Sequence, residues 1–135
     1  MAFIISERRD LQIEEVTALY QANQWSAVRE PTKLYQALVH SHSLITAWDD
    51  DRLIGLSNAI SDSYLVVYYP HLLIHPAYQK KGVGKMIMKR MRGKYGHFHM
   101  QILTADEKAV GFYESMGFVQ AGRTKPMWIY LGNEH

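Results

Sequence analysis

The 135-residue chain contains no cysteine, which excludes disulfide bonds and a thiolate nucleophile. It has no apolar run close to the roughly 18 residues of a membrane span. Met1-Ala2-Phe3 leads directly into strand-like sequence instead of a signal peptide. The seven histidines are scattered, and no acidic partner completes a metal-ligand set. We therefore expect a single domain over residues 1–135 that is cytoplasmic and binds neither a metal nor a membrane.

The segment from Leu72 to Lys85, L-L-I-H-P-A-Y-Q-K-K-G-V-G-K, predicts a strand, a glycine-bearing loop and the start of a helix. Pro76 ends the strand because it has no N–H for the ladder. Gly82 and Gly84 lack the Cβ atoms that would hold a ligand away from the backbone. Free N–H groups and the helix dipole make a helix N-terminus attractive to anions. The segment therefore predicts a pyrophosphate site.

The spacing of the loop excludes two common nucleotide motifs. A G-x-G-x-x-G fingerprint would keep only two of its glycines, and a Walker P-loop would have Gln79 at its first glycine and Met86 at its hydroxyl position. The loop instead matches the Q/R-x-x-G-x-G/A pattern of the GNAT superfamily of acyl-CoA-dependent N-acetyltransferases, which this chain resembles.

Two further regions carry the resemblance. A later segment of this chain resembles the family's second signature. It reads Asp106-Glu107-Lys108-Ala109, followed by Phe112-Tyr113-Glu114-Ser115-Met116-Gly117-Phe118. Asp106 stands where asparagine is usual in the family. That departure puts one side-chain contact to the coenzyme in question. The N-terminal half, including Trp25, Arg29 and Ser61-Asp62, resembles a branch with serotonin- and arylalkylamine-type acetyltransferases.

The resemblance implies an α/β (α+β) GNAT fold: a mixed central sheet of about seven strands, splayed at its central strands and flanked by four helices. Hydrophobic periodicity and turn residues predict the element positions. We expect strands at Phe3–Ser6, Leu44–Trp48, Arg52–Ala59, Leu65–Ile74, His99–Thr104, Phe118–Ala121 and Met127–Leu131, and helices at Leu11–Asn23, Pro31–His40, Val83–Lys94 and Glu107–Met116.

The resemblance also implies acetyl-CoA as cosubstrate. A bulge would splay the strand at Leu72–Ile74 so that its backbone pairs with the pantetheine arm. The implied coenzyme contacts are Leu72, Leu73, Ile74, Gln79, Lys80, Lys81, Gly82, Val83, Gly84, Lys85, Asp106 and Tyr113. Tyr113 stands at the family's position for the acid that protonates the leaving thiolate. Its alternative role is core packing, the usual use of a tyrosine.

The acceptor amine must lose a proton before it attacks, since an alkylamine is mostly cationic at neutral pH. His71 is the candidate base, because imidazole titrates near neutrality and this residue precedes the coenzyme segment. Asp62, Tyr68, Tyr69 and a water relay are rivals, and His71 could instead be structural. His75 is interpreted as structural.

Seven of the fifteen basic residues lie between residues 79 and 94, where no acid occurs. One interpretation is that these cations form a nucleic-acid-binding surface. Against it, no aromatic residues that could stack on bases are interleaved with them. The phosphates of coenzyme A would use only a few of these cations. The others are expected on a solvated helix face. An apolar acceptor cleft could use Trp25, Tyr35, Trp48, Tyr64, Tyr68 and Trp128, which could equally be core.

We therefore expect acetyl transfer from acetyl-CoA to a primary amine of a small molecule or peptide, by direct attack in a ternary complex. The alternative is a non-catalytic acyl-CoA-binding regulatory module of the same fold. The expected partners exclude nucleic acid, and the resemblance suggests a homodimer. The sequence identifies neither the acceptor nor the acyl-chain preference.

Overall fold

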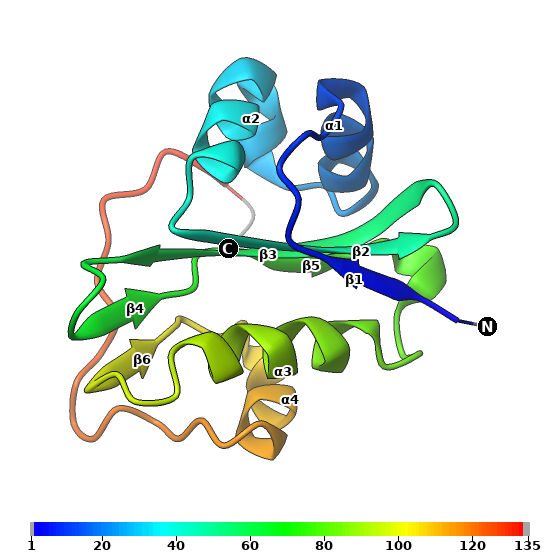
Figure 1. The fold of residues 1–135 in the computed structure, drawn as a ribbon. Helices are drawn as coiled ribbons and strands as arrows, with labels where there is room; N and C mark the ends of the chain where they lie inside the picture. The colour runs from blue at the N-terminus through cyan, green and yellow to red at the C-terminus, as the bar shows by residue number, and fades with distance from the viewer. Residues whose placement is uncertain (1, 134–135) are drawn as a thin grey trace.

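The structure, a computed structural model, describes residues 2–133. The central sheet lies between two helices on each side, with α1 and α2 over one face and α3 and α4 over the other (Figure 1). The strands are β1 (Ile4–Ser6), β2 (Ser43–Asp49), β3 (Arg52–Ser61), β4 (Val66–Tyr68), β5 (Leu72–Ile74) and β6 (Met100–Ile102). The α-helices are α1 (Ile13–Ala22), α2 (Pro31–Val39), α3 (Val83–Lys94) and α4 (Val110–Ser115), and short 3₁₀ helices are η1 (Ser26–Arg29), η2 (Pro76–Tyr78) and η3 (Glu107–Ala109).

The sheet has the order β1-β2-β3-β4-β6, and β5 pairs with β3 as well. The first four strands of this path are antiparallel, whereas β4 and β6 run parallel. One hydrophobic core lies between the sheet and α1–α2, and a second, built around Ile87, Met88 and Met91 of α3, lies on the opposite face. Because β2 and β3 are covered on both faces, their residues are nearly all buried. The mixed α/β sheet flanked by four helices that the sequence predicts is confirmed, with six strands instead of about seven in the described part of the chain.

The long strand predicted at Leu65–Ile74 is divided into β4 and β5. Ile60 pairs with Tyr68 and Ser57 with Leu72, so the two β3 residues between these pairs face the three residues Tyr69, Pro70 and His71. This extra residue is a β-bulge, at which the ladder is locally broken and the strand bends. Pro70 contributes because it has no N–H to donate. Beyond the bulge β5 stays on β3, whereas β6 follows β4, so the sheet opens between β5 and β6.

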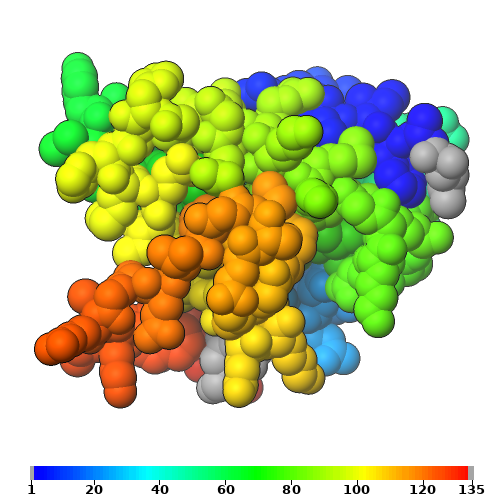
Figure 2. Space-filling model, turned by 90° about the horizontal axis from the view of Figure 1, so that it is seen from below, coloured from blue at the N-terminus to red at the C-terminus, as the bar shows by residue number. Residues whose placement is uncertain are grey.

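The strands predicted at Phe118–Ala121 and Met127–Leu131 are wrong for this structure. Residues 119–133 form no helix or strand, and their backbone bonds are local turns, from Gly122 to Gln120 (2.8 Å) and from Thr124 to Ala121 (3.1 Å). β-branched and aromatic side chains favour a strand only where a neighbouring strand supplies backbone hydrogen-bond partners. Residues 119–133 do not pair with β6, the nearest strand in the sequence. This segment follows α4 around the end of the sheet and returns toward α2 (Figure 1), as a ridge beside α4 in the view from below (Figure 2).

Within residues 2–133, no helix has the length and apolar character required to cross a bilayer. The cytoplasmic location stays a prediction.

Candidate active site

The loop before α3 has the backbone geometry of an anion site. Lys80 (φ 63°) and Gly82 (φ 85°) both adopt left-handed conformations, and Gly82 is the N-cap of the 12-residue helix α3. Val83 buries its side chain, whereas Lys80, Lys81 and Lys85 are exposed. The first N–H groups of a helix have no partner within it, so the amides of this turn point out of the N-terminus of α3 among three lysines. The predicted loop therefore combines the two features that favour anion binding, a helix N-terminus with free amides and nearby lysine side chains.

Next to this loop, β5 presents backbone groups to the opened side of the sheet. His71 O accepts from Asn58 N (3.2 Å) and His75 N donates to Ile54 O (2.8 Å), so these odd-numbered residues bond β3. Because adjacent residues of a ladder point their backbone groups in opposite directions, the groups of Leu72 and Ile74 face away from β3. The Gln79 side chain donates to Ile74 O (3.1 Å), while Leu73 is buried in the core beneath α1 and α2.

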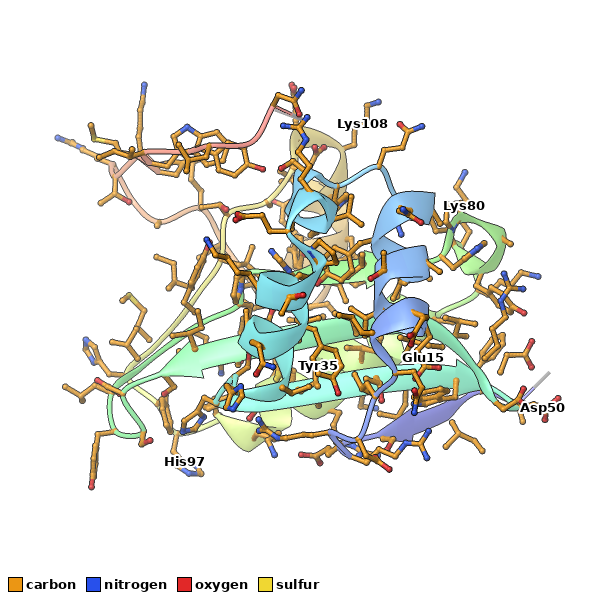
Figure 3. All side chains as sticks on the ribbon, turned by 90° about the horizontal axis from the view of Figure 1, so that it is seen from above. Glu15, Tyr35, Asp50, Lys80, His97 and Lys108 are labelled. Carbon is orange, nitrogen blue, oxygen red and sulfur yellow. The ribbon has the colours of Figure 1, made fainter. Side chains whose placement is uncertain are left out.

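Helix α4 meets both features at one point. A Cβ added to Gly84 would lie 3.6 Å from Phe112 of α4 and 3.7 Å from Ile74 of β5. The start of α3, the end of β5 and α4 therefore converge around Gly84. Figure 3 shows Lys80 and Lys108, from the segments flanking this point, projecting at the upper margin of that view.

Tyr113, the predicted acid, lies on α4 with its ring against Phe112 (5.1 Å) and Phe118 (5.8 Å). Partial burial raises the pKa of its phenol above the ordinary value. Within the described residues its hydroxyl has no hydrogen-bond partner, so it is available to a ligand.

His71, the predicted base, lies in the bulge between β4 and β5. Its Nδ1 is 2.7 Å from the hydroxyl of Tyr20 on α1, and its ring packs edge-on against Trp25 (5.0 Å). Tyr20 is fully buried, and this burial raises its pKa far above the ordinary value, so its phenol stays neutral. In the tautomer whose Nδ1–H donates to Tyr20, the basic lone pair is on Nε2. Sequence patterns did not identify Tyr20 as a partner of His71; the available signal was that a buried tyrosine hydroxyl needs a partner.

Two of the rival bases, Asp62 and Tyr69, have other partners. Asp62 Oδ1 accepts from the N–H groups of Tyr64 (2.8 Å), Leu65 (2.8 Å) and Val66 (3.1 Å), which lower the pKa of this carboxyl. Asp62 thus caps the turn before β4. The buried Tyr69 donates its hydroxyl to Gln101 (2.6 Å), and burial raises its pKa. Tyr68, on β4, is 37% exposed. His75 caps η2 by accepting from Ala77 N (3.0 Å), which agrees with its structural interpretation.

The aromatic residues considered for an acceptor cleft lie in different places. Trp25 contacts His71, whereas Trp48 is core and Tyr35 donates to Leu11 O (2.7 Å). Tyr64 is 85% exposed, and Trp128 stacks on Tyr130 in the C-terminal segment (4.2 Å). Folding therefore disperses this predicted set.

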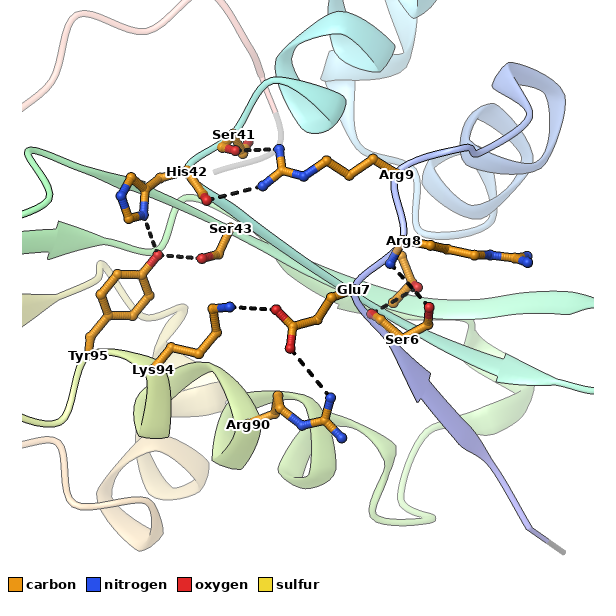
Figure 4. Close-up of polar contacts among 11 residues, drawn as sticks. Ser6, Glu7, Arg8, Arg9, Ser41, His42, Ser43, Arg90, Lys94 and Tyr95 are labelled. Carbon is orange, nitrogen blue, oxygen red and sulfur yellow. Dashed lines mark hydrogen bonds and ion pairs between the residues drawn. The ribbon is translucent and has the colours of Figure 1, made fainter.

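Several charged residues of the predicted regions have structural contacts. Arg90 and Lys94 pair with Glu7 before α1 (Figure 4), and Arg92 donates to Met116 O. The expected solvated helix face therefore anchors neighbouring segments. Asp106 caps η3 by accepting from Lys108 N (2.9 Å), so its carboxylate orders the turn before α4.

Among residues 2–133, no group of three or more histidine, aspartate or glutamate side chains is placed to hold a metal ion.

Comparisons with known proteins agree with this geometry. Residues 8–127 match the family model for the acetyltransferase (GNAT) domain. The chain is 30% identical over 122 residues to "Uncharacterized N-acetyltransferase ycf52-like" of Prochlorococcus marinus, covering 86% of this chain and 67% of that protein.

Among solved structures, the GNAT family protein SP0256 from Streptococcus pneumoniae TIGR4 matches with 32% identity and a TM-score of 0.83, covering 96% of this chain and 99% of the other. AAC(6')-Iy, solved in complex with the bisubstrate analog CoA-S-monomethyl-acetylneamine, has the same fold at 14% identity (TM-score 0.74; 96% and 99% covered). With nearly its whole length matched by the family model, this chain belongs to the GNAT acetyltransferase domain family.

Proposed function

We propose that this protein transfers an acetyl group from acetyl-CoA to the primary amine of a small molecule or peptide. The observation that carries the proposal is the convergence of the α3 N-terminus, the outward-facing backbone of β5 and helix α4 around Gly84. A thioester coenzyme needs an anion site for its phosphates, backbone groups for its amide-bearing arm, and a donor near its sulfur. The proposal assigns these three parts to the N-terminus of α3, to the backbone of β5 and to Tyr113 of α4.

The residues present fit acetyl-CoA. The amides of Gly82 to Lys85 and the nearby lysines would hold the pyrophosphate, since a helix N-terminus binds anions without a bulky side chain. The Leu72 and Ile74 backbone groups would pair with the pantetheine arm, with Gln79 holding the loop against β5. Asp106 is kept in the proposed coenzyme site: its carboxylate accepts from Lys108 N and so orders a turn that would lie beside the coenzyme.

His71 would remove the proton from the ammonium group of the acceptor, through the lone pair of Nε2. Its Nδ1 contact with Tyr20 and its packing against Trp25 fix the orientation of the ring. The neutral nitrogen would then bond to the thioester carbon as the carbon–sulfur bond breaks, and the second proton that the nitrogen must lose to become an amide would pass to solvent. An outward N–H of β5 would donate to the thioester oxygen, where negative charge develops during attack.

Tyr113 would stabilise the departing sulfur. Because burial holds its pKa above the 10.0 of an ordinary phenol, whereas a free thiol titrates at about 8.5, complete proton transfer from Tyr113 to the thiolate is uphill. A hydrogen bond from the phenol to the thiolate, followed by protonation from solvent, fits these values better.

The acceptor class is the finer part of the proposal. Trp25 beside His71 provides an apolar surface for an aryl group, and the resemblance of the N-terminal half favours an arylalkylamine. A peptide amine is the other acceptor that we propose to test.

The decisive experiment measures free thiol released from acetyl-CoA with arylalkylamines, polyamines, amino acids and peptides, with mass spectrometry of each product. We expect one amine class to be acetylated at a rate proportional to enzyme concentration. Tight binding of acetyl-CoA without acetylation of any amine would contradict the proposal and favour a regulatory acyl-CoA-binding module.

A further inference from the structure

A hollow with charged walls lies between the first half of α1 and the turn that joins β2 to β3. Its volume is about 360 Å³, and its lining includes Glu15, Asp51, Arg52 and His75. Small-molecule sites in proteins have volumes of roughly 300–1,000 Å³, so this hollow is large enough for a small ligand. Figure 3 shows Glu15 on α1 and, toward the same end of the molecule, Asp50 in the β2–β3 turn.

His75 reaches this hollow because side chains alternate along β5. Leu73 points into the core beneath α1 and α2, and His75, two positions further, lies on the same face of the sheet. Leu19 of α1 and Leu53 of β3 give the hollow an apolar wall on that face. His75 is four positions from His71, roughly 13 Å along an extended chain, so the hollow is separate from the proposed acetyl-transfer groups.

The imidazole of His75 faces more hydrogen-bond donors than a neutral ring can accept from. The N–H of Ala77 donates to Nδ1 (3.0 Å), so the proton of the neutral ring is on Nε2. Nη2 of Arg52 lies 3.2 Å from that Nε2, yet a guanidinium group only donates. Two N–H donors therefore face each other at the wall of the hollow. An anion bound against both would accept from each of them.

The guanidinium of Arg52 is positioned for such an anion. Arg52 follows three aspartates in the sequence, but no carboxylate of residues 2–133 forms an ion pair with it. It lies instead over the ring of Tyr78 (5.5 Å to the centroid), whose hydroxyl donates to Asp49 (2.6 Å). A planar guanidinium held on an aromatic ring is well suited to a carboxylate, which can accept from two of its N–H groups at once.

Negative groups line the same hollow. Glu15 Oε1 accepts from Gln12 N (3.0 Å), which leaves Oε2 for another donor. The side chain of Asp51 makes no hydrogen bond or ion pair with any other residue that the structure describes. Two carboxylates would repel a dianion such as phosphate, whereas they would accept from an ammonium group. The charges of the hollow therefore match a ligand that carries one carboxylate and one ammonium group.

From these observations we infer that the hollow binds a free α-amino acid with a small apolar side chain, as a ligand that does not react. Its carboxylate accepts from Nη2 of Arg52 and from Nε2–H of His75. Its ammonium group donates to Asp51 and Glu15, and its side chain lies on the apolar wall. The inference does not depend on the proposed function, because none of these groups takes part in acetyl transfer.

The first test is a nuclear magnetic resonance titration of the nitrogen-15-labelled full chain with L-valine, without acetyl-CoA so that no amine is consumed. We expect saturable shifts of the amides of Arg52, His75 and Ala77. Arg52→Gln should weaken binding at least about tenfold, the effect of losing a hydrogen bond to a charged group, with circular dichroism like the parent's. Arg8→Gln is the matched control, since Arg8 also lies over an aromatic ring, that of Trp48 (4.5 Å). The absence of these shifts, or parent-like affinity in Arg52→Gln, would overturn the inference.

The second test separates the two charges of the ligand. Isovalerate keeps the carboxylate of valine without the ammonium group, and isobutylamine keeps the ammonium group without the carboxylate. We expect each to bind at least about tenfold more weakly than valine. Asp51→Asn should weaken the binding of valine and not that of isovalerate, whereas Asp50→Asn, in the same turn but outside the lining, should bind valine like the parent. Tighter binding of isovalerate or inorganic phosphate than of valine would contradict an amino-acid site.

The third test locates the proton on the ring of His75, in a long-range proton–nitrogen spectrum of the full chain near neutral pH. We expect the tautomer with the proton on Nε2, because Nδ1 accepts from Ala77 N. Added valine should shift the Nε2 resonance of His75 and leave that of the exposed His97 in place. A proton on Nδ1 would mean that Arg52 donates to Nε2 without conflict, and the inference would lose its basis.

Discussion

The hydroxyl of Tyr20 lies 2.7 Å from Nδ1 of His71, although the two residues are 51 positions apart in the sequence. Tyr20 is held by the core beneath α1, and His71 by the bulge that ends β4. Because burial keeps the Tyr20 phenol neutral by raising its pKa, this contact orients the imidazole without adding a charge beside it.

Replacing His71 with alanine tests the base. We expect the acetylation rate to fall about 10²- to 10⁴-fold, the usual effect of losing a general base, mainly below about pH 8, where the amine is protonated. The measurement is kcat/KM against pH. The control is His97→Ala, because His97 is an exposed histidine after α3. An unchanged pH profile in the His71 variant would assign the proton to a water relay.

Tyr20→Phe tests the positioning of His71. Loss of a neutral hydrogen bond of about 0.5–1.5 kcal/mol should lower kcat by roughly 2- to 13-fold. The KM for acetyl-CoA should stay the same, because Tyr20 is buried beneath α1 and α2, on the face of the sheet opposite α3 and α4. The pH profile should shift, since Nδ1 loses its partner, and a purely structural role would not move it. Tyr35→Phe, which removes another part-buried hydroxyl, from α2 to Leu11 O, is the control.

Gly84→Ala tests the coenzyme site. The added methyl group meets Phe112 and Ile74 at ordinary contact distances, so the fold should persist. In the proposed site it would also occupy space that the pyrophosphate approaches. Calorimetry should show the affinity for coenzyme A falling at least tenfold, or about 1.4 kcal/mol. Gly93→Ala, in the same helix with nothing within 4 Å, should bind like the parent. Parent-like affinity in Gly84→Ala would contradict the proposed site.

Tyr113→Phe separates catalysis from binding. The ring keeps its packing on Phe112 and Phe118, so affinity for the coenzyme should change little. Loss of a hydrogen bond to a charged sulfur, about 1.5–3 kcal/mol, should lower kcat roughly 10- to 150-fold. The defect should shrink as pH falls, because solvent then protonates the sulfur. Turnover equal to the parent's would leave Tyr113 as a packing residue.

Glu7→Gln tests the contact between the N-terminal segment and α3. The hydrogen bond from Lys94 lowers the pKa of the Glu7 carboxyl below its ordinary 4.5, with Arg90 adding to the effect and partial burial opposing it. Because the folded-state pKa is the lower one, the contact stabilises the fold above the unfolded-state pKa and is lost as pH falls through the folded-state value.

At neutral pH the Glu7 variant should be less stable by at most about 1 kcal/mol, since the pair is partly exposed. The difference should decrease below pH 4.5 and at high salt. Chemical denaturation at several pH values measures it. Glu30→Gln, which removes the exposed pair with Lys33, is the control. A difference that persists at pH 2 would assign the effect to packing.

The features whose cause is local could be predicted from the residues alone. Gly82 and Gly84 specify the loop because the turn before α3 needs a left-handed residue and a bare backbone, and Val83, Ile87 and Met91 predict the buried face of α3. The family, the mixed sheet and four of its predicted strands were therefore accessible from motif and periodicity.

The remaining features emerge only on folding, because they depend on partners far away in the chain. The bulge at Tyr69–His71 exists only as a mismatch with β3, and it brings His71 to Tyr20. Residues 127–131 do show the apolar alternation of a strand, but a strand also needs a neighbour, and none lies beside them in the described part of this chain. Local patterns fix which surfaces a segment offers, whereas the packing of distant segments fixes which of those surfaces are used.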